Sequence, residues 1–188
     1  MPLAHPHTLR AARRGERAAQ HELYVAFAPR VFGVCLRYAS TREEADDWAQ
    51  DTWVAAFAKL GQYRSEGDFG AWLRRVCVNT CLQHLRRGHL LVDAAAAERL
   101  AEGTGPIPEA LHVAPDALAR LSAAELVAHV NALPAGYRLV FNLVAVEGYS
   151  HAEAAEALGI TVSTSRSQLV RARTALQRRL AGLLTVSL

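Results

Sequence analysis

Apolar residues recur every three or four positions through most of the chain, which is the spacing of one face of an α-helix. The first apolar stripe consists of Leu23, Phe27, Val31, Val34, Cys35 and Tyr38. Pro29 lies within this stripe and predicts a kink or a split there, because proline lacks the N–H that a helix interior needs. Strand-like alternation of apolar and polar residues is absent from the sequence. The pattern therefore predicts an all-α protein.

Capping signals divide the following residues into two further helices. Thr41 and Glu44 have the spacing of a capping box. The stripe behind them consists of Ala45, Trp48, Ala49, Thr52, Trp53, Ala56, Phe57 and Leu60. The segment LGQYRSEGD then predicts a loop, and its Asp68 is a suitable N-cap for a helix over residues 69–87. Gly88 is placed to end that helix.

The character of the sequence changes at residues 88–121, which are rich in Ala, Gly and Pro and have no sustained periodicity. They predict a flexible linker with one short helix near residues 93–101. Helical periodicity returns near Ser122, is broken by Pro134, and resumes over residues 135–146. The expected organisation is a flexible extension at 1–19, a helical domain at 20–87, the linker at 88–121, and a second helical domain at 122–188.

Residues 150–180 carry the most informative pattern of the chain. Ser150 and Glu153 form a capping box, Gly159 ends this short helix, and a helix of about five turns begins after Thr161. A helix, a glycine-containing turn and a second helix make up the helix-turn-helix layout. The second helix contains no acid and five arginines, namely Arg166, Arg171, Arg173, Arg178 and Arg179. These arginines could hold phosphates, so the pattern indicates a DNA recognition helix. The alternative interpretation is an ordinary basic amphipathic helix that closes a small bundle.

Charge is spread unevenly, although the net charge is only +3. Residues 41–51 contain a single base, Arg42, and five acids, namely Glu43, Glu44, Asp46, Asp47 and Asp51. Residues 69–87 contain no acid and four arginines, namely Arg74, Arg75, Arg86 and Arg87. Partners of opposite charge would explain this distribution, and solvated helix faces are the alternative explanation.

The three cysteines fit reduced thiols. Cys77 and Cys81 lie four residues apart on one predicted helix, an arrangement that orients a pair poorly for a disulfide. One helix face also offers too few ligands for a closed zinc site, unless Cys35 joins from a neighbouring helix. Small buried cysteines are the favoured interpretation. No apolar run is long enough for a membrane span and no secretory signal is recognisable, so we expect a cytoplasmic protein.

Three motifs, in this order, resemble the ECF-type (extracytoplasmic function) sigma factors of bacterial RNA polymerase. EADDWAQDTW at 44–53 resembles their acidic polymerase-binding helix, and FGAWLRRVCVNTCLQHLRR at 69–87 resembles their promoter-melting helix. LPAGYRLVFNLVAVEGYSHAEAAEALGITVSTSRSQLVRAR at 133–173 resembles their C-terminal DNA-binding domain. The resemblance implies two helical domains joined by a linker, the second of them a helix-turn-helix.

The resemblance also implies roles for individual residues. Polymerase contacts fall on Asp47, Gln50 and Asp51. Recognition of the −10 element and melting fall on Arg64, Asp68, Phe69, Trp72, Arg75, Asn79, Arg86 and Arg87. Recognition of the −35 element falls on Ser163, Thr164, Arg166, Ser167, Gln168, Arg171 and Arg173. Packing in the core is the favoured alternative for Trp72, because an aromatic residue at helical spacing usually faces the interior.

The implied function is therefore that of a transcription initiation factor and not of an enzyme, with core RNA polymerase, promoter DNA and an anti-sigma factor as partners. No cofactor and no membrane insertion are expected. A stand-alone repressor or activator with an N-terminal dimerisation domain is the second hypothesis, but such a domain would need neither the acidic nor the basic helix. An anti-sigma antagonist that has lost DNA binding is the third, and the intact arginine series in the last helix is evidence against it.

Overall fold

The computed structural model describes residues 4–63, 67–87 and 122–185. Every regular element in this part of the chain is a helix, which confirms the all-α prediction. The chain divides into two compact units, Met1–His84 and Leu85–Leu188. The linker expected at residues 88–121, with its short helix, lies outside the described residues. No helix in the described part is both long and apolar enough to cross a lipid bilayer.

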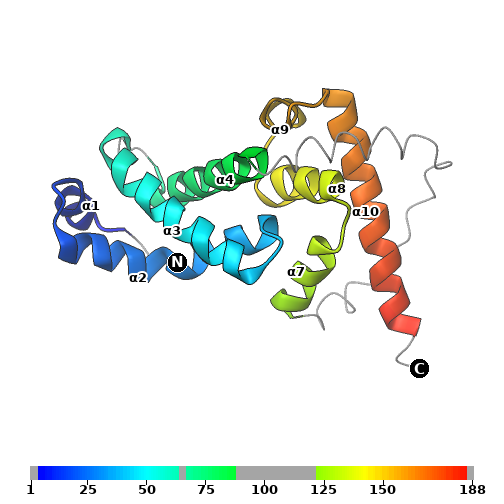
Figure 1. Cartoon of the computed structure of the whole chain (residues 1–188), viewed down its shortest axis with the longest axis horizontal. Helices are drawn as coiled ribbons and strands as arrows, with labels where there is room; N and C mark the ends of the chain where they lie inside the picture. The colour runs from blue at the N-terminus through cyan, green and yellow to red at the C-terminus, as the bar shows by residue number, and fades with distance from the viewer. Residues whose placement is uncertain (1–3, 64–66, 88–121, 186–188) are drawn as a thin grey trace. The chain divides into compact units, whose positions relative to one another are not determined.

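The N-terminal helices pack side by side (Figure 1). They are α1 (Pro6–Arg13), α2 (Arg17–Tyr38), α3 (Arg42–Lys59), the short 3₁₀ turn η1 (Leu60–Gln62) and α4 (Phe69–Arg87). The predicted N-cap at Thr41 is confirmed, since its hydroxyl accepts a hydrogen bond from the N–H of Glu44 at 3.1 Å. The predicted capping box is incomplete, because the Glu44 carboxylate accepts from the N–H of Ser40 at 2.8 Å and not from that of Thr41. Asp68 likewise accepts bonds from Gly70 N–H at 3.1 Å and Ala71 N–H at 3.2 Å. These caps fix where α3 and α4 begin.

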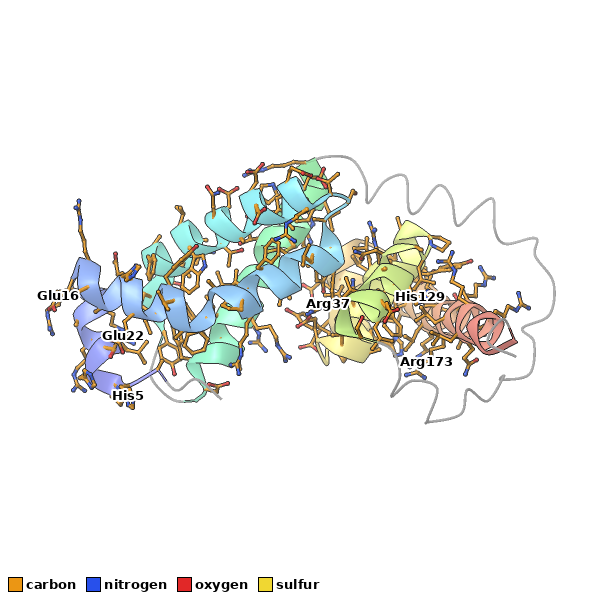
Figure 2. The ribbon with its side chains drawn as sticks, turned by 90° about the horizontal axis from the view of Figure 1, so that it is seen from below. His5, Glu16, Glu22, Arg37, His129 and Arg173 are labelled. Carbon is orange, nitrogen blue, oxygen red and sulfur yellow. The ribbon has the colours of Figure 1, made fainter. Side chains whose placement is uncertain are left out.

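Helix α1 lies within the segment expected to be flexible. It packs on α2 by burying Thr8, Leu9 and Ala12. The Thr8 hydroxyl also donates a hydrogen bond to Oε1 of Glu22, which is labelled in Figure 2, at 3.1 Å. The buried positions span little more than one turn, so this apolar face was too short to stand out in the sequence.

The sequence predicted a kink or a split at Pro29. Helix α2 continues through this residue, so the split is wrong, whereas the kink stays a prediction. Pro29 lies on the exposed side of α2, where water can satisfy the carbonyl that lost its N–H partner. On the other side Leu23, Phe27 and Val31 are buried. The packing of this face therefore keeps the helix in one piece.

The C-terminal unit consists of helices around the long helix α10 (orange to red in Figure 1). They are α7 (Ala123–Asn131), α8 (Ala135–Val140), the π-helical segment η2 (Phe141–Val146), α9 (His151–Leu158) and α10 (Val162–Thr185). Capping boxes at Ser122–Glu125 and Ser150–Glu153 begin α7 and α9. Gly159 ends α9 with φ of 68°. The helix-turn-helix predicted from the sequence is therefore present.

Candidate functional site

An exposed polar patch lies on α3. Asp47, Gln50 and Asp51 are exposed and are spaced so that they share one face of the helix. Val54, one turn further along this face, is 70% exposed. We call Asp47, Gln50, Asp51 and Val54 the α3 patch. Val54 falls outside the apolar stripe of α3, so its exposure follows from the helical spacing, but a lone valine carries no charge pattern that would mark a binding surface.

A side-chain contact ties this patch to α4. Nε2 of His84 lies 2.9 Å from Oδ2 of Asp51. The His84 ring also stacks on Trp48, with 5.1 Å between the ring centroids and 10° between the planes. Asp51 nevertheless keeps 58% of its side chain exposed, so it remains accessible to a partner. Sequence reasoning missed His84, since an isolated histidine on a basic helix carries no pattern of its own.

Four aromatic rings meet at the start of α4. Phe69 contacts Phe27, Tyr63 and Trp72, with centroid distances of 5.2, 5.6 and 5.5 Å. Only 4% of Phe69 is exposed, so it belongs to the core and the expectation of a DNA-facing wedge is not met. Trp72 is half-buried and packs against Phe69 and Tyr63, as its favoured alternative predicted.

The loop before α4 is held by local hydrogen bonds. The Tyr63 hydroxyl donates to the carbonyl of Gly67 at 2.6 Å. Burial, and next the Asp68 carboxylate, raise the pKa of Tyr63, so the hydroxyl stays protonated as this bond requires. Asp68 is exposed, but both of its carboxylate oxygens accept bonds from the first turn of α4. Asp68 therefore acts first as a helix cap. Arg64 lies outside the described residues.

A polar and basic stripe runs along the exposed side of α4. Arg75, Asn79, Gln83 and Arg86 are exposed and follow one another at spacings of four, four and three residues, so they share one face. We call these four residues the α4 stripe. Arg87 is exposed beside it. Because no acid occurs anywhere on α4, the stripe is suited to a negatively charged backbone such as single-stranded DNA.

The outer face of α10 carries most of the residues expected to read the −35 element. Ser163, Arg166 and Arg173 are exposed, and Ser167 is half-buried on the same face. Arg173 is labelled in Figure 2. Val170 lies among them and is 40% exposed. We call Ser163, Arg166, Ser167, Val170 and Arg173 the α10 face.

Two further residues expected at this surface lie near its edge. Thr164 is half-buried, and its N–H donates to the Thr161 hydroxyl at 3.0 Å, which caps α10. Arg171 is half-buried as well. Ser165 is fully buried and its hydroxyl lies 2.9 Å from Nδ1 of His151, so it joins the two helices of the motif. These polar groups therefore hold the helix-turn-helix together at its turn.

Gln168 does not lie on the DNA-facing surface. Only 2% of it is exposed, beside the buried residue Leu169. Its side chain packs over Gly136 of α8, where a Cβ atom would come 3.0 Å from Nε2 of Gln168. The expected base contact by Gln168 is therefore not supported. Glycine at position 136 leaves room for a long polar side chain, and the sequence of α10 alone cannot reveal this neighbour.

Two parts of the chain match models of known protein families. Residues 23–89 match the family model for Sigma-70 region 2, and residues 123–176 match that for Sigma-70, region 4. The ECF RNA polymerase sigma factor SigM of Mycobacterium tuberculosis is 32% identical over 172 residues, which cover 91% of this chain and 82% of SigM. The chain belongs to the ECF sigma factors. The RNA polymerase sigma-H factor of Pseudomonas aeruginosa is 29% identical to this sigma factor over 177 residues, or 91% of each chain.

Solved structures agree with this assignment. CnrH, solved in complex with the cytosolic domain of CnrY, is 25% identical with a TM-score of 0.52, and the match covers 95% of this sigma factor and 98% of CnrH. The sigma factor RpoE of Bartonella quintana, solved with the anti-sigma factor NepR, has the same identity and TM-score. That match covers 86% of this sigma factor and 96% of RpoE.

Proposed function

We propose that this ECF sigma factor directs core RNA polymerase to promoters by using three separate surfaces. The α3 patch binds polymerase, the α4 stripe holds the melted −10 region, and the α10 face reads the −35 element. The observation that carries the proposal is the juxtaposition of an acidic surface on α3 and a basic surface on α4, which the contact of Asp51 with His84 connects, in a chain that also contains a helix-turn-helix. A stand-alone repressor would need the helix-turn-helix and a dimerisation domain, but neither the acidic nor the basic surface.

The α3 patch has the chemistry of a protein-binding surface. Asp47 and Asp51 supply negative charge, Gln50 supplies an amide, and Val54 adds an exposed apolar group. Charged groups at the rim of an interface steer association, while an apolar group excludes water at its centre. A basic, partly apolar helical surface on the polymerase fits this combination.

The α4 stripe stabilises open promoter DNA by binding it and not by chemical catalysis. Arg75 and Arg86 supply positive charge for phosphates, and Asn79 supplies an amide that can pair with the edge of an unstacked base. The closed duplex does not present such bases. A surface that binds only the open form shifts the equilibrium towards it by its difference in affinity.

The α10 face combines phosphate and base contacts. Arg166 and Arg173 can hold phosphates, and Ser163 at the start of the helix can reach base edges in the major groove. Val170 lies between them and is suited to an apolar contact with a thymine methyl group. The α10 face contains two arginines and so makes few phosphate contacts, and weak binding to duplex DNA is therefore expected until polymerase adds further contacts.

We further propose that an anti-sigma factor regulates this protein in the cytoplasm. The Bartonella RpoE was solved with the anti-sigma factor NepR, and CnrH was solved with the cytosolic domain of CnrY. Such a partner would compete with polymerase if it covered the α3 patch, the α4 stripe or both. Competition of a partner with core polymerase for the purified sigma factor, measured by size-exclusion chromatography, tests this proposal.

Run-off transcription tests the main proposal. Purified sigma factor is combined with core polymerase, and permanganate reactivity of thymines on a bound promoter reports melting. We expect melting and transcripts only when both proteins are present. Tight dimeric binding to a palindromic site without polymerase, with no melting on a promoter that the complex occupies, would favour the stand-alone regulator instead.

A further inference from the structure

The three cysteines of the chain meet in the core of the N-terminal unit. Cys35 comes from α2, whereas Cys77 and Cys81 come from successive turns of α4. The Sγ atoms of Cys35 and Cys77 are 3.5 Å apart, and those of Cys35 and Cys81 are 3.9 Å apart. All three sulfurs lie within 4.8 Å of one another, and none of the three residues is exposed.

These distances match those of three sulfurs around one ion. Thiolate sulfur binds Zn²⁺ at about 2.3 Å, and three sulfurs at that distance in a trigonal plane lie about 4.0 Å from one another. A disulfide, in contrast, brings two sulfurs to about 2.05 Å. The cluster is therefore a set of reduced thiols that is already close to the geometry of an S₃ site.

The chemistry of the cluster selects the kind of ion. In the described part of the chain, no histidine or carboxylate joins the three thiols. The nearby Thr52 hydroxyl donates its proton to the carbonyl of Trp48 at 2.8 Å. A site with three sulfurs, and with no nitrogen or carboxylate ligand among the described residues, favours a soft ion that binds three ligands. Zn²⁺ fits less well, because it almost always takes four.

The charge of the three thiolates further restricts which ion the site can bind. A buried charge is costly unless it is compensated, and three thiolates carry three negative charges. A trivalent ion would make the complex neutral, whereas a monovalent ion such as Cu⁺ would leave a net negative charge in the core. We propose that Cys35, Cys77 and Cys81 form a three-thiolate binding site for a soft trivalent metalloid ion, of which arsenite is the accessible probe.

The binding step balances without an oxidant. Arsenous acid has three As–OH groups, and each exchanges with one thiol to form an As–S bond and a water molecule. Three As–O bonds and three S–H bonds break, three As–S bonds form, and three waters leave. Arsenic remains trivalent.

A groove gives access to the cluster. A cavity of ≈ 470 Å³ lies between α2 and α4, and Cys77 forms part of its lining. Arg30, Arg37 and Arg74 also line it, while Val31, Val34 and Leu73 supply apolar wall. Neutral arsenous acid can therefore approach Cys77 without crossing the whole core. Once bound, the ion would join α2 to α4, the helix that carries the α4 stripe.

The test uses the full chain, reduced with a phosphine and mixed with arsenite. Native mass spectrometry should show one arsenic per chain with three protons displaced. All three cysteines of the chain are buried, so alkylation is continued until the arsenite-free protein has three modified thiols, and the arsenite-bound protein should then have none. Zn²⁺ as a probe should bind at least ten-fold more weakly. The single variants Cys35→Ala, Cys77→Ala and Cys81→Ala should each weaken arsenite binding at least ten-fold.

Several results would overturn the site. They are no uptake by the wild type, unchanged alkylation, tighter binding of Zn²⁺ than of arsenite, or undiminished arsenite binding by any single variant that remains folded by circular dichroism. If a variant does not fold, the wild type alone still tests whether all three cysteines bind arsenic. An ion held by only two sulfurs leaves one thiol open to alkylation, whereas an ion held by three protects every thiol. A product two protons lighter that contains no arsenic would show a disulfide and would also overturn the proposal.

Discussion

His84 of α4 contacts Asp51 of α3 through a 2.9 Å approach of Nε2 to Oδ2. The same imidazole stacks on Trp48, so it is held from two sides by α3. Asp51 belongs to the α3 patch, and His84 lies on the helix that carries the α4 stripe. The proposed polymerase contact and the proposed DNA contact are therefore connected by one pair of side chains, and a change on either helix can reach the other through them.

Asp47→Arg should weaken binding to core polymerase without changing the fold, because Asp47 is exposed in the α3 patch and has no part in the His84 contact. We expect a loss of about ten-fold in affinity, which corresponds to about 1.4 kcal/mol. Asp46→Arg is the comparison variant, since Asp46 is also exposed but lies about 100° around the helix from Asp47 and neighbours only Gln50 of the patch, so its effect should be smaller. Equal effects of the two changes on polymerase binding would contradict the assignment of the patch.

Gln168→Ala should destabilise the C-terminal unit by about 1–3 kcal/mol, because it removes a buried polar side chain and leaves a cavity. Gly136→Ala should also destabilise it, by about 1–3 kcal/mol, because the new Cβ would lie 3.0 Å from Nε2 of Gln168. The double variant should lose less stability than the sum of the two single losses, since alanine at 168 makes room for the new methyl group.

Chemical denaturation of the four proteins in this cycle measures the coupling free energy. Strictly additive changes in the free energy of unfolding would show that there is no steric coupling between the two positions. A changed −35 preference in Gln168→Ala, with unchanged stability, would restore the base contact expected from the sequence.

Gly159→Ala should destabilise the helix-turn-helix by about 1 kcal/mol. Gly159 has φ of 68°, a conformation that costs residues with a Cβ about 1–2 kcal/mol. No atom lies within 4 Å of the Cβ position, so backbone strain is the only expected cause. Gly61→Ala is a control, because Gly61 also has open space but lacks a positive φ. Thermal unfolding measures the stability of both variants. Equal losses of stability in the two would argue against backbone strain at Gly159 as the cause.

Local features of the sequence were enough to predict much of this structure. The capping pairs at Thr41 and Ser150 and the stop at Gly159 depend on residues a few positions apart, so the sequence contains all of their partners. The exposed arginines of α4 and α10 follow equally from helical spacing. These features placed most of the proposed site before any tertiary contact was known.

Features that depend on distant neighbours were not predictable in this way. Gln168 is polar and lies in a basic helix, but its environment is set by Gly136 on another helix. Phe69 lies beside a predicted DNA-binding loop, yet contacts with Phe27 and Tyr63 place it in the core. Pro29 is tolerated because of the side of α2 on which it lies. In each case tertiary packing outweighs what the residue type favours on its own.

Asn79→Ala should reduce promoter melting while leaving the −35 contact intact, because Asn79 is exposed at the centre of the α4 stripe and lies in a different unit from α10. Loss of a base contact worth about 1–3 kcal/mol should lower the open-complex population at least several-fold where melting is incomplete. Permanganate reactivity of promoter thymines measures this directly. Arg74→Ala is the matched control: Arg74 lies on the same helix but lines the groove towards α2, so its loss should affect melting less. A variant lacking Asn79 that melts promoters as the wild type does would remove this residue from the proposed site. A larger defect in Arg74→Ala than in Asn79→Ala would instead place the DNA along the groove between α2 and α4, and the α4 stripe would lose its proposed role.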